Sequence, residues 1–396
     1  MKTEWVHKKL GDDDVAKIIM GQSPSSASYN DENIGLPFLQ GCADFGEVFP
    51  KTSVYCNEPL KVAPQNSILM SVRAPVGTIN KADQKYIIGR GLCSIVSLIN
   101  NDYLYYYLLQ NKNRLEQKAQ GSTFLAINSA EVNDFDVSYP ADLSAQRRIA
   151  AILASADKVI AATQKTIAKY KQIKQGMMED LLNEQCTMNN VQWKKVKLGE
   201  VVNVFDGTHQ TPYYVETGIP FYSVENVTAN DFEHTKYITE EEHLFLTQKH
   251  KIEKGDILMT RIGSIGVCKY VNWDVNASFY VSLALLKIKE GFDAEYLVQY
   301  SQIEAFKKSI LHESLTFAYP QKINLGDINN VEIAVPYKND KPDLVEQRRI
   351  AAILSGIDAK IAAEEKVLEK YEKVKKGLME RLFERQDASS ITSESN

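Results

Sequence analysis

The chain has 396 residues, with 46 Lys and Arg against 51 Asp and Glu, and 44% of its residues are hydrophobic, which is typical of a globular protein and not of a disordered one. At roughly 150 residues per domain, the length predicts two or three domains that each bury a core. No apolar run approaches the ~18 residues of a membrane helix and the first residues carry no export signal, so we expect a cytoplasmic protein with no membrane partner.

Residues 1–142 are predicted to form a module of mixed α and β structure. Short strand-like runs at 67–72 and 86–88 are bounded by Gly and Pro, and 103–109 has the pattern of a local helix. The loop at 21–26 is rich in small polar residues. Loops on a rigid scaffold often carry recognition, although Gly, Ser and Pro are equally the ordinary residues of turns.

Residues 143–183 are predicted to form one long helix. Apolar positions recur in alternating steps of four and three over about five heptads, which is the pattern of a coiled-coil seam. Asp142 is a suitable N-cap. At about 1.5 Å per residue the helix would be roughly 60 Å long. The seam includes Ile149, Leu153, Ile160, Ile167 and Tyr170, all of which we expect to pack.

The same succession then repeats. A short linker at 184–192 leads to a second mixed module at 193–343, with a strand-like run at 256–260, a local helix at 294–302 and a polar, aromatic loop at 206–214. A second long helix is predicted at 344–385, capped by Asp343, and residues 386–396 are expected to be a disordered tail. The second seam includes Ile350, Leu354, Ile361, Leu368 and Tyr371.

The two long helices are copies of each other. Residues 143–182 and 344–383 are identical at 21 of 40 positions without a gap, whereas the offset between the halves grows from 188 at Trp5 and Trp193 to 201 at the helices. Loops tolerate insertions, but an insertion in a packed helix rotates every later side chain by about 100°. The repeated unit is therefore a variable module followed by a rigid spacer.

The simplest partner for each apolar stripe is the other copy. We expect the helices to pair in antiparallel sense, with Lys174 and Lys375 as polar seam positions that set register, and the alternative is that each helix pairs with another subunit. The predicted fold is thus α+β. Two mixed α/β modules are joined and spaced by two long antiparallel coiled-coil helices, related by a pseudo-two-fold internal repeat.

Catalytic and metal-binding motifs are missing from the sequence. It contains no P-loop, no dinucleotide fingerprint, no nucleophile elbow and no zinc-protease pattern, and the five cysteines form no Cys-x-x-Cys pair. We therefore expect no metal and no catalytic residue. The modules are net acidic, with 13 basic and 16 acidic residues in 1–142 and 16 and 22 in 183–343, so nucleic-acid binding would need a local patch or a basic partner.

Three repeated segments resemble the specificity subunits of type I restriction–modification systems. They are Gln146-Arg147-Arg148-Ile149-Ala150-Ala151-Ile152-Leu153, repeated at 347–354, the strand-like run 68–73 with its partner 257–261, and the segment from Gly121 to Asn128 before the helix. The resemblance covers the chain from Trp5 to Phe383, in the order recognition domain, helix, recognition domain, helix.

The resemblance implies a non-catalytic DNA-specificity subunit. Each module would be a target recognition domain reading one half of a bipartite, asymmetric site in double-stranded DNA. The helices would set the gap between the half-sites, about one turn or ~34 Å apart, and dock two methyltransferase subunits. Those subunits would bind S-adenosylmethionine and methylate adenine N6, whereas this chain would hold no cofactor. Motor–nuclease subunits belong to the full restriction complex, and the residues do not say whether one is present here.

Several residues are candidates for DNA contact in that case. Arg73 and Arg261 follow matched strands and would fork onto guanine, hold a phosphate or form a structural ion pair. The remaining candidates are polar or aromatic side chains in loops and lysines near turns: Ser23, Gln40, Lys81, Lys85, Thr208, His209, Gln210, Tyr213, Asn226, Lys269, Gln321 and Lys322. The arginines at the helix starts, which are Arg147, Arg148, Arg348 and Arg349, are candidates for contact with partner subunits or phosphates.

Two other classes of protein remain open at this point. One is a coiled-coil scaffold whose modules bind protein. The other is an enzyme with an unrecognised site, such as a nuclease built from scattered acidic residues.

Overall fold

The computed structural model describes residues 4–119, 125–182, 192–315 and 318–383, and it divides into two compact units. Unit 1 contains residues 1–164 and 366–396, and unit 2 contains residues 165–365. Each long helix, α4 (Leu143–Leu181) and α11 (Leu344–Phe383), contributes one half to each unit. No helix of the described residues is long and apolar enough to cross a bilayer.

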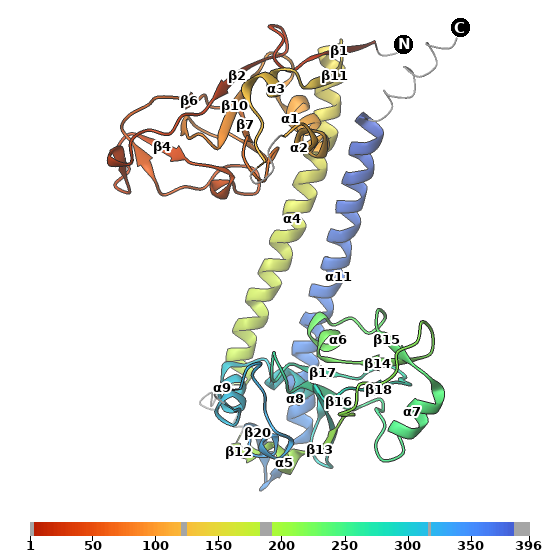
Figure 1. Cartoon of the computed structure of the whole chain (residues 1–396). Helices are drawn as coiled ribbons and strands as arrows, with labels where there is room; N and C mark the ends of the chain where they lie inside the picture. The colour runs from red at the N-terminus through yellow and green to blue at the C-terminus, as the bar shows by residue number, and fades with distance from the viewer. Residues whose placement is uncertain (1–3, 120–124, 183–191, 316–317, 384–396) are drawn as a thin grey trace, which may run out of the picture. The chain divides into compact units, whose positions relative to one another are not determined.

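Unit 1 is a mixed α and β module set against the first half of α4 and the second half of α11 (Figure 1). Its sheets have the strand orders β1-β11, β2-β10-β7-β8 and β3-β5-β4-β9-β6. The strands are β1 (Trp5–Lys9), β2 (Ala16–Met20), β3 (Tyr29–Asn30), β4 (Leu36–Leu39), β5 (Tyr55–Cys56), β6 (Val62–Ala63), β7 (Ile68–Ser71), β8 (Ile79–Lys81), β9 (Tyr86–Ile88), β10 (Leu92–Ser97) and β11 (Asp136–Pro140). The helices are α1 (Asn101–Gln110), α2 (Lys112–Lys118) and α3 (Ser129–Asn133), with 3-10 turns at Ser26–Ser28 and Cys42–Asp44.

Unit 2 repeats this plan with the other halves of the two helices. Its sheets have the orders β12-β20-β21, β13-β19-β16-β17 and β15-β14-β18. The strands are β12 (Gln192–Lys197), β13 (Val202–Asp206), β14 (Ile219–Tyr222), β15 (Lys236–Ile238), β16 (Ile257–Thr260), β17 (Cys268–Tyr270), β18 (Ser278–Phe279), β19 (Leu283–Ile288), β20 (Glu332–Lys338) and β21 (Lys341–Pro342). The helices are α5 (Leu198–Val201), α6 (Val224–Ala229), α7 (Glu240–Leu246), α8 (Ala294–Tyr300), α9 (Glu304–His312) and α10 (Leu325–Ile328).

The central strands show why the modules fold alike. All four residues of β7 and of β16 are buried, as expected for a strand with neighbours on both sides and packing on both faces. β10 pairs with both β2 and β7, and β19 pairs in the same way with β13 and β16. The predicted strands and local helices therefore belong to one scaffold used twice.

The antiparallel pairing of the long helices within one chain is confirmed. In unit 1, Asp157 of α4 faces Lys375 of α11, and Leu153 shares a core with Phe383. In unit 2, Lys174 of α4 faces Asp358 of α11. As the residue number increases along α4, the number of the facing residue in α11 decreases, which is the antiparallel arrangement.

The predicted seam is largely buried. Leu153, Ile350 and Leu354 are fully buried, Ile160, Ile167 and Ile361 nearly so, and Ile149, Tyr170 and Leu368 are half-buried. Tyr371 differs from its expected packing, since 40% of its surface is exposed. Towards the helix ends the buried positions are Met178, Leu182, Met379 and Phe383, one residue beyond a strict heptad. An α-helix of 3.6 residues per turn drifts in this direction against a 3.5 repeat.

Both helix starts are fixed by their predicted caps and by a repeated glutamine. The Asp142 carboxylate accepts from the Ser144 N–H at 2.9 Å, and Asp343 accepts from the Val345 N–H at 3.1 Å. The buried Gln146 accepts from the Asn100 N–H, and the buried Gln347 accepts from the Asp293 N–H. Each glutamine thus ties its long helix to the N-terminus of α1 or α8. The predicted linker and tail lie outside the described residues, apart from Gln192, which begins β12.

Candidate nucleic-acid interface

Each module brings three loops together at one sheet edge. In unit 1, β4 and β9 are parallel, so their carboxyl ends meet at the same edge. The chain after β2 joins them there, because the Gln22 N–H donates to the Ile88 carbonyl at 2.9 Å and the Gly89 N–H donates to the Leu39 carbonyl at 2.8 Å. We call this the reader edge of unit 1.

Unit 2 has the equivalent reader edge. β14 and β18 are parallel, the Thr208 N–H donates to the Phe279 carbonyl at 3.2 Å, and the Tyr280 N–H donates to the Tyr222 carbonyl at 2.9 Å. In each unit, a glycine is required where the loop after β2 or β13 passes against the loop after the second parallel strand. A Cβ at Gly21 would lie 2.1 Å from the Gly89 carbonyl oxygen, and one at Gly207 would lie 2.6 Å from the Phe279 carbonyl oxygen.

The two reader edges carry different side chains on this common backbone. At the edge of unit 1 the Ser23 hydroxyl lies 3.2 Å from the Gln40 amide nitrogen and accepts from the Arg90 N–H at 3.2 Å. The hydrogen bonds that define the loops make Ser23 equivalent to His209, and Gln40 equivalent to Ser223. A shared frame with unlike polar groups can present two different sets of donors and acceptors.

Asp206 organises the edge of unit 2. Its Oδ1 accepts from the Arg261 guanidinium at 3.0 Å, and its Oδ2 lies 2.6 Å from His209 Nε2. Arg261 is buried and also donates from Nε to the Val281 carbonyl at 2.8 Å. Of the three interpretations of Arg261, the structure therefore supports the structural ion pair, and its guanidinium does not face solvent.

Arg73 and Arg261 are not equivalent, which corrects the match expected from the sequence. Ile127 N–H donates to the Val72 carbonyl, whereas the Ile323 N–H donates to the Arg261 carbonyl, so the equivalent of Arg261 is Val72. A shift of one residue in extended chain moves a side chain to the opposite face. Arg73 is accordingly exposed.

Three other candidates are engaged inside the fold. Asn226 is buried and its side chain bonds the Ser223 N–H and the Asp231 carbonyl, so it does not face a ligand. Lys81 pairs with Asp102 at 2.7 Å. Lys269 bonds the Asn230 side chain at 2.5 Å and lies over the Trp273 ring, and burial lowers its pKa.

The remaining candidates lie at the surface. Thr208 is half-buried and its hydroxyl donates to the Gln210 carbonyl at 3.2 Å, while Tyr213 is 80% exposed. Gln210, Gln321, Lys322 and Lys85 are also exposed. Lys322 pairs through its backbone with Ile262, close to the turn that follows β16.

The helix-start arginines separate into two kinds. Arg349 forms a two-bond pair with Glu346, which raises the Arg349 pKa, and Arg348 lies 3.5 Å from Asp293. Arg147 and Arg148 are exposed, and Arg148 lies 3.5 Å from the Ser144 hydroxyl.

Two exposed residues were missed by sequence reasoning. Arg90 follows β9 between two glycines, directly at the reader edge of unit 1. Tyr319 is fully exposed beside Pro320 and Gln321. The sequence contained one signal for Arg90, the Gly89-Arg90-Gly91 segment after a strand-like run, but the outward direction of its side chain did not follow from that pattern, since Arg261 also follows a buried strand and points inward.

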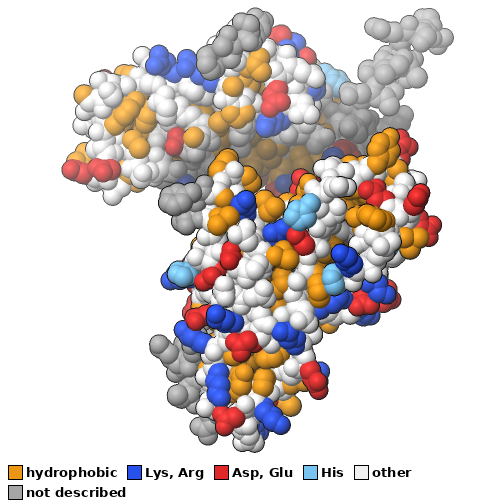
Figure 2. All heavy atoms as spheres, turned by 60° about the horizontal axis from the view of Figure 1, so that its bottom comes forward, with side chains coloured by type: hydrophobic (Ala, Val, Ile, Leu, Met, Phe, Trp, Pro, Cys, Tyr) orange, Lys and Arg blue, Asp and Glu red, His pale blue; other side chains and the backbone are white. Residues whose placement is uncertain are grey.

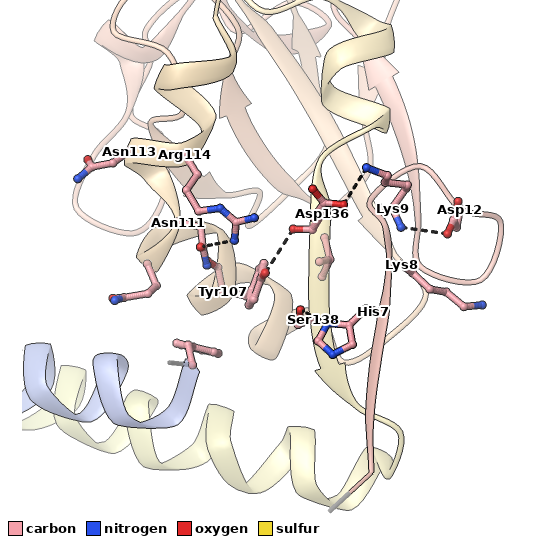
Figure 3. Close-up of a pocket in the computed structure, with 13 residues that line it drawn as sticks. His7, Lys8, Lys9, Asp12, Tyr107, Asn111, Asn113, Arg114, Asp136 and Ser138 are labelled. Carbon is pink, nitrogen blue, oxygen red and sulfur yellow. Dashed lines mark hydrogen bonds and ion pairs between the residues drawn. The ribbon is translucent and has the colours of Figure 1, made fainter. Parts of the chain in front are cut away.

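A hollow of about 840 Å³ lies elsewhere in unit 1 (Figure 3). His7 and Lys9 of β1, Tyr107 of α1, Arg114 of α2 and Asp136 of β11 line it. Their side chains form ion pairs and hydrogen bonds with neighbouring residues of the hollow. Lys9 forms an ion pair with Asp136 at 2.7 Å, and the Tyr107 hydroxyl donates to the Asp136 carbonyl at 3.3 Å. They form a network of ion pairs and hydrogen bonds, which also includes a contact of 2.7 Å between the Ser138 hydroxyl and Nδ1 of His7.

Charge is mixed on the face of the molecule that Figure 2 shows. There, Lys and Arg side chains are interspersed with Asp and Glu over the described residues, without a broad field of one sign. Among the described residues, no group of three or more His, Cys, Asp or Glu is placed to hold a metal ion.

The chain is similar to known proteins over most of its length. Residues 2–173 and 190–373 match the family described as type I restriction modification DNA specificity domain. A putative type I restriction enzyme MjaX specificity subunit of Methanocaldococcus jannaschii is 41% identical over 182 residues, which are 45% of this chain and 43% of that protein. The match thus spans less than half of that relative. The MjaVIII specificity subunit of the same organism is 26% identical over 307 residues, which are 72% of this chain and 70% of that protein.

Two solved structures share the fold. The type I restriction–modification S subunit of M. genitalium superposes with a TM-score of 0.68 at 17% identity, covering 96% of each chain. A chain from a structural study of complex assembly and conformational transition of the type I system gives 0.57 at 18% identity, covering 97% of this chain and 99% of that one.

Proposed function

The chain belongs to the type I restriction–modification DNA specificity family, and on that premise we propose that it selects a bipartite, asymmetric site in double-stranded DNA for a type I complex. Its relatives are named specificity subunits, so its role is recognition and not catalysis. The observation that carries the proposal is the pair of reader edges. They share a backbone frame and differ in side chains, as expected of two modules that read different half-sites.

Local groups supply the proposed contacts with DNA. Phosphate contacts position a protein on a duplex and base-edge contacts specify the sequence. At the reader edge of unit 1, Arg90, Ser23 and Gln40 offer a cation and hydrogen-bonding groups at one place. At the edge of unit 2, His209 and Gln210 stand exposed. Because the modules are net acidic, a basic partner would provide much of the phosphate neutralisation.

We propose that two methyltransferase subunits dock on the long helices. Beside its buried seam α4 exposes three apolar side chains, Ile152 and Val159 in unit 1 and Ile173 in unit 2, each 40–45% exposed, with Thr166 at the position between the last two. Exposed apolar side chains on one side of a helix suit the apolar face of a partner helix. Those subunits would supply S-adenosylmethionine and adenine N6 methylation, and motor–nuclease subunits would join for cleavage.

Exchange of one module tests this function. Long-read methylation mapping of the host should show an adenine methylated within a split, non-palindromic motif that disappears when the gene is deleted. Replacing residues 1–142 by the corresponding module of another specificity subunit should change one half of the motif only. Persistence of every modified motif after deletion would contradict the proposal and favour a protein-binding scaffold.

The spacing between half-sites provides a second test. Seven residues, two helical turns, inserted at matched places within 155–175 and its partner segment in α11 should lengthen the gap between the half-sites or abolish methylation. An unchanged gap would exclude the helices as its ruler, while leaving module-based selection intact.

A further inference from the structure

The Asp206 carboxylate joins a buried cation to an exposed imidazole. One oxygen is committed to Arg261, whose guanidinium also donates to the carbonyls of Val281 and Ile323. The other oxygen lies 2.6 Å from Nε2 of His209, whose side chain is 71% exposed. The fixed part of the network therefore holds the orientation of a group at the surface.

This contact determines which ring nitrogen of His209 carries the proton. An ionised carboxylate only accepts hydrogen bonds, so Nε2 must donate. Nδ1 of the neutral ring is then a bare acceptor on the other side of the imidazole. A ring turned by another partner would present the opposite chemistry, so Asp206 is the positioning residue for His209.

The backbone that carries His209 is also held in place. The Thr208 N–H donates to Phe279, the Val281 N–H donates to the Thr208 carbonyl at 3.0 Å, and the Gln210 N–H donates to the Thr208 hydroxyl at 3.3 Å. An exposed ion pair contributes little to stability. A fixed, exposed and oriented acceptor at the reader edge is better explained by ligand recognition than by folding.

We propose that His209 is a specificity-determining residue of the second module, and that its Nδ1 accepts a hydrogen bond from the exocyclic amino group of adenine or cytosine. The inference rests on the proposed function. In the major groove only adenine N6 and cytosine N4 donate, whereas guanine presents acceptors and thymine an acceptor with a methyl group. Asp206 and Arg261 are the charged groups behind the ring, and Lys249 lines the cavity beside Asp206.

Two substitutions separate the ring nitrogens. His209→Asn places an amide oxygen where Nδ1 stands, whereas His209→Gln retains a donor towards Asp206 and removes the acceptor. His234→Gln is the control, because His234 is a second exposed histidine, 87% exposed, whose Nδ1 rather than Nε2 pairs with a carboxylate, that of Asp231 at 3.0 Å. Both of the residues replaced are at the surface, so we expect the three variants to have the same melting temperature as the wild type.

The assay is selection from duplexes with both half-sites randomised, using the full chain with its co-purified methyltransferase subunits at pH 8. We expect one position of one half-site to favour A or C. His209→Gln should reduce that preference about tenfold, within the range of a base contact, while His209→Asn and His234→Gln preserve it.

The outcomes distinguish this inference from the proposed function. If the wild-type complex selects a split motif and His209→Gln selects it unchanged, the role of His209 is refuted and the proposed function stands. A lost preference for G or T would refute the acceptor assignment. If the wild-type complex shows no sequence preference, the proposed function itself fails and the inference fails with it.

Discussion

The buried Lys174–Asp358 pair sets the register of the helices in unit 2, and its two ends should respond differently to substitution. Lys174 Nζ lies 2.6 and 2.8 Å from the Asp358 oxygens and 2.7 Å from the Gln302 side-chain oxygen. The lysine side chain is 11% exposed, but that of Asp358 is 40% exposed. We compare Asp358→Asn, which removes the negative charge, with Lys174→Met, which removes the buried positive one.

The two losses follow from what each variant leaves behind. Asp358→Asn leaves an ammonium group buried among neutral partners, and breaking a buried pair in this way costs about 3–5 kcal/mol. Because Asp358 is partly hydrated already, we expect the lower end, about 3 kcal/mol. Lys174→Met keeps the apolar stem and leaves a carboxylate that water and Gln299 can solvate, so we expect about 1 kcal/mol.

Urea unfolding followed by circular dichroism and by the fluorescence of Trp193 and Trp273 measures both losses. For a unit of this size, about 3 kcal/mol corresponds to a fall in Tm of roughly 6–12 °C. Lys373→Met is the control, since its pair with Glu369 is exposed and should contribute little to stability. If Lys174→Met destabilises as much as Asp358→Asn, the asymmetric burial does not govern the pair and the reasoning is wrong.

Three further predictions concern packing and reactivity. Arg261→Met should lower the free energy of unfolding by about 2–4 kcal/mol, because Asp206 and two carbonyls lose their donor. Arg73→Met should change it by no more than ~0.5 kcal/mol. Equal losses for the two variants in thermal melts would contradict the difference in register. Gln347→Leu should cost about 2 kcal/mol in urea unfolding by leaving the Asp293 N–H without an acceptor, and a neutral result would argue against its role. Burial raises the pKa of Cys93 to about 12, so labelling at pH 8, read by mass spectrometry, should spare it in the folded chain, and rapid native labelling would refute its burial.

The helical part of the fold was predictable because its signals are local and repeated. The caps Asp142 and Asp343, the start of each helix and most of the seam follow from short-range patterns, and the duplication supports an internal partner. The predicted burial of Tyr371 was wrong, because a heptad pattern identifies the side of a helix that faces a partner but not how closely the partner helix approaches at each position.

The reader edges were less predictable because they depend on non-local pairing. The parallel pairs β4 with β9 and β14 with β18 join residues 49 and 57 positions apart in the chain, and no local pattern predicts them. Two arginines after similar strands looked equivalent, yet one residue of register sends Arg261 inward and Arg73 outward. The burial of Asn226 was missed for the same reason. The sequence suggests a polar loop residue, but in the fold its side chain bonds the Ser223 N–H and the Asp231 carbonyl.

Two equivalent ion pairs, one in each unit, explain how the modules can diverge in sequence without changing the pairing of the long helices. Asp157 binds Lys375 of the facing helix at 2.5 Å and accepts from the Tyr106 hydroxyl of α1 at 2.6 Å, and burial and Asp157 together raise the Tyr106 pKa. In unit 2, Asp358 binds Lys174 and accepts from Gln299 of α8. Each aspartate thus fixes helix register and module attachment at once, at positions 201 residues apart in the chain. Because attachment depends on these internal contacts and on the glutamines at the helix starts, the loops of the reader edge are free to change while the register of the helices is preserved.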